Sequence, residues 1–371
     1  MTILISTDQI YLHGGIEKVM ATKVNYWAKD LDNRVFIVTT EQHGKLPCYD
    51  IDANVKMIDL AINYDRSQSY FSLANLKKSL SHFQKQKKLF EKLQPDIIIS
   101  PNFNFDHYWL PVIKKKARLV KERHASRYLE AIRRQKPTLL RKLRYKFDDW
   151  IDSKYNHIIV LNKDEEAYVK SGNAVVIPNP VEISELRADI SKKQIIAAGR
   201  LSPVKGFEDL IAAFALIQPL FPEWQLHFYG QDYLGTQQRL ERLIEDLKLR
   251  ETVFFKGNVN DMQETMTNYS IYAMTSETEC FPMVLLEALS VGLPIVSYDC
   301  PNGPRNILKD GTDSFLVPHK NITIFAKKLK ILMQEENLRQ CMSGKGFENV
   351  RRFSVHNIMA QWNNLFHNSV N

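Results

Sequence analysis

The sequence lacks a hydrophobic run long enough to cross a membrane. The longest uninterrupted apolar stretch among the 371 residues is Leu210 to Ile217, whereas a membrane-spanning helix needs about 20 apolar residues. The first residues, Met-Thr-Ile-Leu-Ile-Ser, also lack the basic start, long apolar segment and small-residue cleavage site of a secretory signal. We therefore expect a cytoplasmic protein whose chain begins with a buried strand.

Cysteine is scarce as well. The four cysteines show no paired spacing of the zinc or redox type and are too few for a disulfide scaffold in so long a chain. We expect reduced thiols. The dinucleotide fingerprint G-x-G-x-x-G is absent after the expected first strand of either half, which argues against a nicotinamide or flavin dinucleotide site.

Acidic residues are scarce in one segment. From Lys114 to Phe147 there are 14 lysines and arginines but only Glu122 and Glu130, so this segment carries +12 while the whole chain carries +8. The remaining residues therefore sum to −4. Such asymmetry suggests an anionic partner, with nucleic acid and membrane as the usual candidates, or else a solvated helix face.

Apolar residues follow the same basic segment at helical spacing. They are Leu139, Leu140, Leu143, Phe147 and Trp150. They predict a basic amphipathic helix within residues 133–150 that would rest on an anionic membrane surface. Packing into the core of the N-terminal half is the equally weighted alternative.

Short apolar runs rich in branched residues alternate with helical patterns along the whole chain, which predicts an α/β protein with parallel sheets. The expected strands of the first half are Ile3–Ser6, Val35–Thr39, Ile97–Ser100, Leu119–Val120 and His157–Leu161. Those of the second half are Ile195–Ala198, Gln225–Tyr229, Val253–Phe255, Ile271–Met274, Pro294–Tyr298 and Ser314–Val317.

The segment Ile177-Pro178-Asn179-Pro180 interrupts this alternation, because two prolines within three residues stop regular structure and stiffen the chain. We expect an N-terminal domain over 1–178, a C-terminal domain over 179–352, and a last helix in 353–371. The apolar stripe of that helix would suit either half, and we expect it to return to the N-terminal domain.

A loop with two cations follows the expected strand Ile195–Ala198. It runs from Gly199 to Gly206 and contains Arg200 and Lys205. Ligands of open α/β sheets bind beyond the carboxyl ends of the strands, where a guanidinium fork and an ammonium would suit a diphosphate. The alternative is two surface cations at a turn.

A second segment, Glu279 to Glu287, follows the expected strand Ile271–Met274. A helix beginning near Pro282 would present the free amides of Met283 and Val284 at its positive end, which is a site for an anion unless water or Glu279 satisfies them. A pair of glycines, Gly14 and Gly15, precedes the first helix and permits close approach of a phosphate or sugar, although a tight turn explains them equally well.

These residues together resemble the retaining glycosyltransferases of family 4, which have the GT-B fold of two Rossmann-like parallel-sheet domains facing each other across a cleft. The matching segments are Gly14-Gly15 with Glu17 and Lys18, Ile177-Pro178-Asn179-Pro180, Gly199-Arg200 with Lys205-Gly206, Glu279 with Glu287, and Gly303 with Gly311. They follow the order and spacing of the family over nearly the whole chain.

The resemblance implies roles on the donor side. Arg200 and Lys205 would bind the donor diphosphate, Glu287 the ribose, and Glu279 the hydroxyls of the transferred sugar. The amides of Met283 and Val284, with Gly15, would complete the diphosphate cradle, and Phe281 would belong to the same donor-binding segment.

His124 is similar in position to a histidine or asparagine that such enzymes place against the donor sugar, which implies a catalytic role. Asp106 and His107 are weaker candidates for the acceptor side. The resemblance implies no cofactor and no metal, because cations and helix amides can stabilise the departing diphosphate.

Two residues depart from the family pattern. Cys280 stands where glycine is usual and Asn306 where glutamate is usual, which leaves open how these positions contact the sugar. The surrounding Asp299–Arg305 resembles a variant found in bacterial surface-polysaccharide transferases.

The resemblance predicts transfer of a hexose or N-acetylhexosamine from a UDP-linked nucleotide sugar to a lipid-linked or oligosaccharide acceptor. The enzyme would work in the cytoplasm, peripherally on the inner face of the membrane. The rival predictions are a nucleotide-sugar epimerase of the same fold and a basic nucleic-acid-binding protein.

Overall fold

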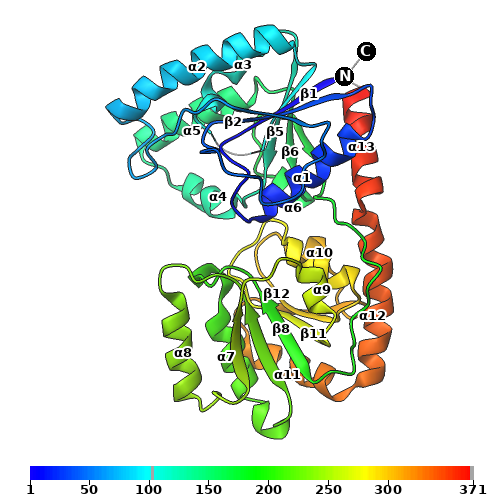
Figure 1. The fold of residues 1–371 in the computed structure, drawn as a ribbon. Coiled ribbons are helices and arrows are strands. Elements are labelled where there is room, and N and C mark those ends of the chain that lie inside the picture. The colour runs from blue at the N-terminus through cyan, green and yellow to red at the C-terminus, as the bar shows by residue number, and fades with distance from the viewer. Residues whose placement is uncertain (102–103, 368–371) are drawn as a thin grey trace. The chain divides into compact units, whose positions relative to one another are not determined.

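The computed structural model describes residues 1–101 and 104–367, and its contacts divide the chain into two compact units. Unit 1 comprises Met1–Pro180 and Met359–Asn371, and unit 2 comprises Val181–Ile358. Each unit contains one parallel sheet with helices packed around it (Figure 1), as the alternation of apolar runs and helical patterns predicts.

The sheet of unit 1 has seven strands in the order β3-β2-β1-β4-β5-β6-β7, and every neighbouring pair is parallel. The strands are β1 (Thr2–Thr7), β2 (Arg34–Thr39), β3 (Lys56–Asp59), β4 (Ile97–Ser100), β5 (Arg118–Arg123), β6 (His157–Val160) and β7 (Ala174–Val176). The helices are α1 (Gly15–Ala28), α2 (Leu73–Leu93), α3 (Leu110–Ile113), α4 (Tyr128–Gln135), α5 (Leu139–Asp152) and α6 (Lys163–Glu166).

The sheet of unit 2 has six parallel strands in the order β10-β9-β8-β11-β12-β13. The strands are β8 (Gln194–Ala198), β9 (Gln225–Tyr229), β10 (Val253–Gly257), β11 (Ile271–Met274), β12 (Ile295–Asp299) and β13 (Ser314–Pro318). The helices are α7 (Phe207–Ala215), α8 (Thr236–Asp246), α9 (Met262–Met266), α10 (Met283–Ser290), α11 (Ile322–Gln334) and α12 (Glu336–Val350).

All eleven strands expected from the sequence are present, whereas β3 and β7 were not expected. Both stand at the edges of the sheet of unit 1. No residue of these two strands, all of which the structure describes, is fully buried. An edge strand that is not covered on both faces needs no continuous apolar run, so it gives no signal in the sequence.

The last helix, α13 (Val355–His367), begins in unit 2 and belongs to unit 1 from Met359 on. In unit 1 its rings pack on α1, where Trp362 and Phe366 lie with centroids 5.9 Å and 5.4 Å from that of Trp27. The apolar stripe of the last helix is thus covered by aromatic contacts with the first helix.

None of the helices in the described part of the chain has the length and hydropathy that a membrane crossing requires. None of the four cysteines, all of which the structure describes, forms a disulfide; Cys280 and Cys300 are buried and Cys341 is exposed.

The strand order reverses at one point in each sheet. This point lies between β1 and β4 in unit 1 and between β8 and β11 in unit 2. The loops that leave neighbouring strands there diverge to opposite faces of the sheet and leave room for a ligand. The sequence segments singled out above follow β8 and β11 in unit 2.

Candidate functional site

The loops after β8 and β11 form the candidate site of unit 2. The first loop contains Arg200 and Lys205, and the second contains Glu279 and leads into α10. Although the two segments are far apart in the sequence, the adjacent strands β8 and β11 bring their starting points together.

Gly206 fastens the first loop to the end of β11. Its φ of 58° is left-handed, and a β-carbon added there would stand 2.3 Å from the carbonyl oxygen of Thr275. The Thr275 hydroxyl in turn donates a hydrogen bond to the Gly206 carbonyl at 2.8 Å. This close approach requires glycine. It also fixes the backbone position of Lys205, the residue directly before Gly206.

The two cations of the first loop have different surroundings. The Lys205 ammonium lies 2.7 Å from an Oε1 oxygen of Glu279, so it joins the two loops. The Arg200 guanidinium lies over the ring of Tyr233, 5.2 Å from the centroid. Within the described residues Arg200 has no acidic partner, so its charge is available to a ligand.

The second loop is held by a close contact with Gly303. A β-carbon on Gly303 would lie 2.8 Å from both the Cβ of Glu279 and the Cδ of Pro282. The backbone of Glu279 also forms an isolated β-bridge with that of Asn302. The backbone of Glu279 is thereby fixed while its carboxylate reaches Lys205.

Helix α10 begins at Met283, one residue later than Pro282, which stands at the N-cap without a capping side chain. The amides of Met283 and Val284 have no hydrogen-bond acceptor among the residues that the structure describes. Free amides at the positive end of a helix dipole attract an anion. Phe281 is buried against the ring of Phe353, with centroids 5.5 Å apart.

Glu287 lies in the second turn of α10 and is buried. The neighbouring Tyr272 of β11 is fully buried and donates a hydrogen bond from its hydroxyl to the Ala198 carbonyl at 3.2 Å. Burial, followed by the carboxylates of Glu279 and Glu287, raises the pKa of Tyr272 above its ordinary value.

Two hydroxyl groups of the second loop were not anticipated from the sequence. The side-chain oxygens of Ser276 and Thr278 are buried without a hydrogen-bond partner in the described structure. Buried hydroxyls normally have partners, so both are candidates to bind a ligand. The polar residues directly after the apolar strand β11 are the signal that could have indicated them.

The positions that depart from the family pattern are both built into the site. Cys280 is buried beside Glu279. Asn306 donates a backbone hydrogen bond to the Gly303 carbonyl at 3.2 Å, in the loop that Glu279 contacts. Burial, together with Glu279 and Asp299, raises the pKa of the nearby Cys300 thiol to about 12, which leaves it a poor nucleophile.

Gly15 and His124 belong to unit 1. Gly15 is exposed at the first position of α1. Directly before it, Gly14 approaches the Glu17 carboxylate so closely that a β-carbon would stand 2.3 Å from it. Gly15 therefore offers its backbone at a helix start, as the sequence suggests, and its part in donor binding stays a prediction.

His124 follows β5 and is held in a buried charged cluster. Its Nε2 lies 3.1 Å from an oxygen of Glu122, and the fully buried Lys23 of α1 lies 2.6 Å from the other oxygen. The Nδ1 atom of His124 is buried with no partner among the described residues. His124 can therefore offer Nδ1 to a ligand.

Asp106 and His107 are poor candidates for contacting an acceptor, because both are buried inside unit 1. Asp106 is fully buried and accepts hydrogen bonds from Ser6 and Gln86 at 2.8 and 2.9 Å. His107 lies 3.1 Å from the hydroxyl of Tyr155. Both bonds to Asp106 go to its Oδ2, while its Oδ1 is buried without a hydrogen-bond partner in the described structure. Burial inside unit 1 keeps both side chains from an acceptor at the surface.

Two protein-family models match the chain. Residues 13–185 match the model described as Glycosyltransferase Family 4, and residues 179–348 match the model described as Glycosyl transferases group 1. Together the two models span residues 13–348, which include every residue of the candidate site.

Relatives with curated names are similar over about half of the chain. An exopolysaccharide phosphotransferase of Streptomyces coelicolor is 36% identical over 193 residues, which are 51% of this chain and 20% of that protein. A poly(ribitol-phosphate) alpha-N-acetylglucosaminyltransferase of Staphylococcus aureus is 26% identical over 220 residues, which are 58% of this chain and 44% of that protein. The chain thus spans less than half the length of either relative.

A solved structure of S. aureus TarM in complex with UDP and alpha-GlcNAc-glycerol resembles the whole chain. The TM-score is 0.78, the sequence identity is 18%, and 99% of each chain is covered. This likeness confirms the predicted fold class of two Rossmann-like parallel-sheet domains.

Proposed function

The chain belongs to the family 4 glycosyltransferases of GT-B fold, and from this premise we propose that it transfers a hexose or N-acetylhexosamine in surface polysaccharide synthesis. The donor is a nucleotide sugar, with UDP as its nucleotide. The acceptor is a lipid-linked saccharide or an oligosaccharide.

The observation that carries this proposal is the convergence of cations and free amides at the switch point of unit 2. Arg200 has no acidic partner within the described residues, and Lys205 reaches the second loop from the first. The free amides of Met283 and Val284 begin α10. Hydrogen-bond donors that are already in place around a developing negative charge stabilise a departing diphosphate.

The ion pair between Lys205 and Glu279 suggests how the donor is received. The Glu279 carboxylate neutralises the ammonium at 2.7 Å. When the diphosphate binds, Lys205 turns to the phosphate oxygens and Glu279 becomes free to accept hydrogen bonds from the sugar hydroxyls. Glu287 then binds the ribose. The contact of His124 with the donor sugar stays a prediction of the family resemblance.

We propose retention at the anomeric carbon by departure and attack on the same face. The bond between the anomeric carbon and the diphosphate oxygen breaks, the acceptor oxygen bonds to that carbon, and the acceptor proton passes to the departing diphosphate. The alpha linkage in the name of the S. aureus relative supports retention, because UDP-hexoses carry the sugar in the alpha configuration. The cations and amides supply the charge stabilisation, so the proposal includes no metal and no cofactor.

The decisive variant is Arg200→Ala. Arg200 is one of the preorganised hydrogen-bond donors to the developing negative charge, so its loss should lower kcat by about 10²–10³. The thermal unfolding curve should stay unchanged. The matched control is Arg242→Ala on α8, which removes an exposed arginine of the same unit. Near-normal turnover of Arg200→Ala would contradict the assignment.

Acceptor dependence separates the transferase from an epimerase. A transferase without acceptor should hydrolyse its donor only slowly, whereas an epimerase would convert the donor fully and release free product. NMR of the product then determines the anomeric configuration. An inverted linkage would refute same-face transfer and leave the transferase assignment intact.

A further inference from the structure

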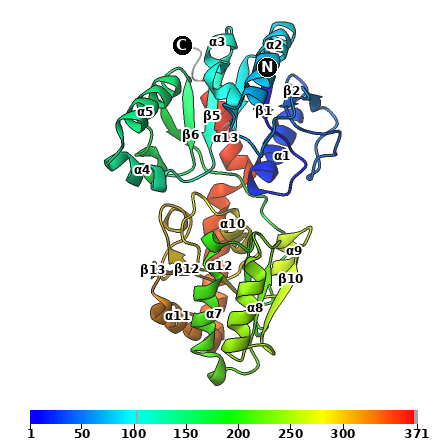
Figure 2. The same cartoon turned by 90° about the vertical axis from the view of Figure 1, so that its left-hand side faces the viewer.

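Helices α4 and α5 form a hairpin between β5 and β6 (Figure 2). Many apolar side chains of this hairpin are exposed. The structure describes every residue of both helices, and within them only Ile151 and Asp152 are buried. The exposed large hydrophobic residues of the hairpin are Leu129, Ile132, Leu139, Leu140, Leu143, Phe147 and Trp150. The alternative that the stripe of α5 packs into the core is therefore wrong. Exposed apolar side chains gathered on one hairpin are typical of an interaction site.

Aromatic contacts extend this surface beyond the hairpin. The ring of Trp150 stacks on Phe147 at 5.8 Å, and Phe147 stacks on Tyr108 at 5.9 Å. Tyr108 in turn lies 6.4 Å from Phe71, an exposed residue shortly before α2. The aromatic part of the surface is therefore continuous across three segments of unit 1.

Helix α5 carries cations without acidic partners as well as the apolar residues. Within the described residues, Arg141, Lys142 and Lys146 of α5 form no ion pair, in contrast to Arg134, which bonds Glu130 and Asp149. From residue 127 to residue 150 there are eight lysines and arginines and three acidic residues, a net charge of +5. The surplus of positive charge lies beside the apolar stripe.

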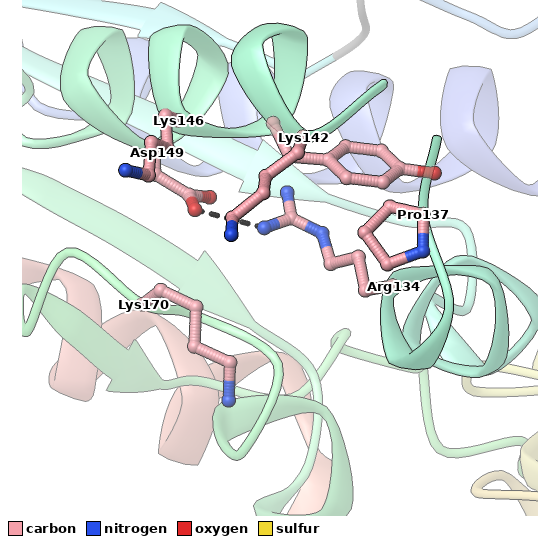
Figure 3. A pocket seen from close by; sticks show the side chains of 7 residues that line it. Arg134, Pro137, Lys142, Lys146, Asp149 and Lys170 are labelled. Atoms are coloured by element: carbon pink, nitrogen blue, oxygen red, sulfur yellow. Dashed lines mark hydrogen bonds and ion pairs between the residues drawn. The ribbon is translucent and has the colours of Figure 1, made fainter. Parts of the chain in front are cut away.

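The same helices border a cationic pocket of about 500 Å³. Figure 3 shows Arg134, Lys142, Lys146 and Lys170 around it, with the Asp149 carboxylate bonded to Arg134. Four cations against one carboxylate favour a phosphate group, because guanidinium and ammonium groups donate to its oxygens.

We propose that the α4–α5 hairpin docks on a bilayer of anionic phospholipid. The pocket takes the phosphate of a lipid headgroup, while Leu139, Leu140 and Trp150 enter the boundary of the acyl chains. At 100° per residue, Lys142 and Lys146 flank the apolar stripe on one side and Arg144 on the other. This is the arrangement of a helix lying in a membrane interface.

Two other occupants fit the surface less well. A nucleic acid or another soluble polyanion would use the cations, and bases could stack on the aromatic rings. It would leave the leucines uncovered, although Leu139 and Leu140 are 74% and 80% exposed. A second copy of the chain would bring the same cations together across a symmetric contact, where like charges repel. A bilayer uses both the charge and the apolar side chains.

Trp150 reports the docking directly. The structure describes all five tryptophans of the chain, and Trp150 is the one with an exposed side chain. Vesicles containing phosphatidylglycerol should shift its emission to shorter wavelength, whereas vesicles of phosphatidylcholine alone should not. Trp150→Phe should abolish the shift and preserve binding in a sedimentation assay. No sugar nucleotide is present, so the result does not depend on the proposed transfer reaction.

Paired variants test the two components of the surface. Lys142→Gln with Lys146→Gln should lower partitioning into anionic vesicles about 30-fold, at about fivefold per cation. Leu139→Gln with Leu140→Gln should lower it at least about tenfold. The matched controls in unit 2, Lys327→Gln with Lys330→Gln and Leu216→Gln with Leu220→Gln, should leave it within about twofold.

Several outcomes would overturn the proposal. One is an absence of vesicle binding at about 0.15 M salt, and another is an equal loss in the control pairs. A third is loss through the lysine pair alone with no shift of Trp150 emission. In that case binding of inorganic polyphosphate and single-stranded RNA to the same variants would identify a polyanion site instead.

Discussion

Two buried carboxylates of unit 1 have pKa values displaced in opposite directions by their neighbours. Burial alone raises the pKa of Glu122, but Lys23 and His124 outweigh it and lower the value to about 2. Burial raises the pKa of Asp106 to about 6, because its partners Ser6 and Gln86 are neutral and lower it only in part. Glu122 therefore stays charged beside His124, whereas Asp106 gains a proton in mildly acidic solution.

The pH dependence of stability should reveal Asp106. Because its folded pKa lies above the reference value of 3.8, the folded state binds the proton more tightly. Its contribution to stability is full below about pH 4 and is lost as the pH rises through about 6. Between about pH 7 and pH 4 the native chain should gain on the order of 2 kcal/mol relative to Asp106→Asn. Parallel urea midpoints for the two proteins across this range would contradict the assignment.

At the scale of elements, the short loops after β8 and β11 position the candidate site. Gly206 begins α7 with a left-handed φ of 58° and touches the backbone of Thr275. Gly235 begins α8 with a φ of 69°, but a β-carbon there would meet nothing within 4 Å. The two glycines share a left-handed backbone conformation and differ in the close contact.

This difference defines a matched pair of variants. Gly235→Ala should lower the free energy of unfolding by about 1 kcal/mol, the cost of the left-handed backbone alone. Gly206→Ala should cost about 3 kcal/mol or more, because the loop must also move away from Thr275. It should also weaken UDP binding, since Lys205 moves with the loop. Equal effects of the two variants on stability and on UDP binding, measured by denaturation and calorimetry, would show that the contact is unimportant.

For the whole molecule, the two units should respond differently to ligand. UDP at about 100 times its dissociation constant stabilises the folded form by about 2.7 kcal/mol. Hydrogen exchange with UDP should be slowed in residues 199–206 and 275–284 of unit 2. Hydrogen exchange in the α4–α5 hairpin should be slowed by anionic vesicles and not by UDP. Protection of the hairpin by UDP would link it to the donor site and contradict its separate function.

The sequence determined the alternation of strands and helices and the two loops that follow β8 and β11. It did so because branched apolar runs, turn glycines and loop cations are local patterns. It also indicated an amphipathic α5, but an apolar stripe suits a core as well as a surface. Only the tertiary structure shows that no described residue of unit 1 covers Leu139 or Leu140. The tertiary structure likewise decided that Asp106 is buried and that Lys205 pairs with Glu279, 74 residues away. Burial and pairing depend on which distant segments pack together, and a local sequence pattern does not determine that.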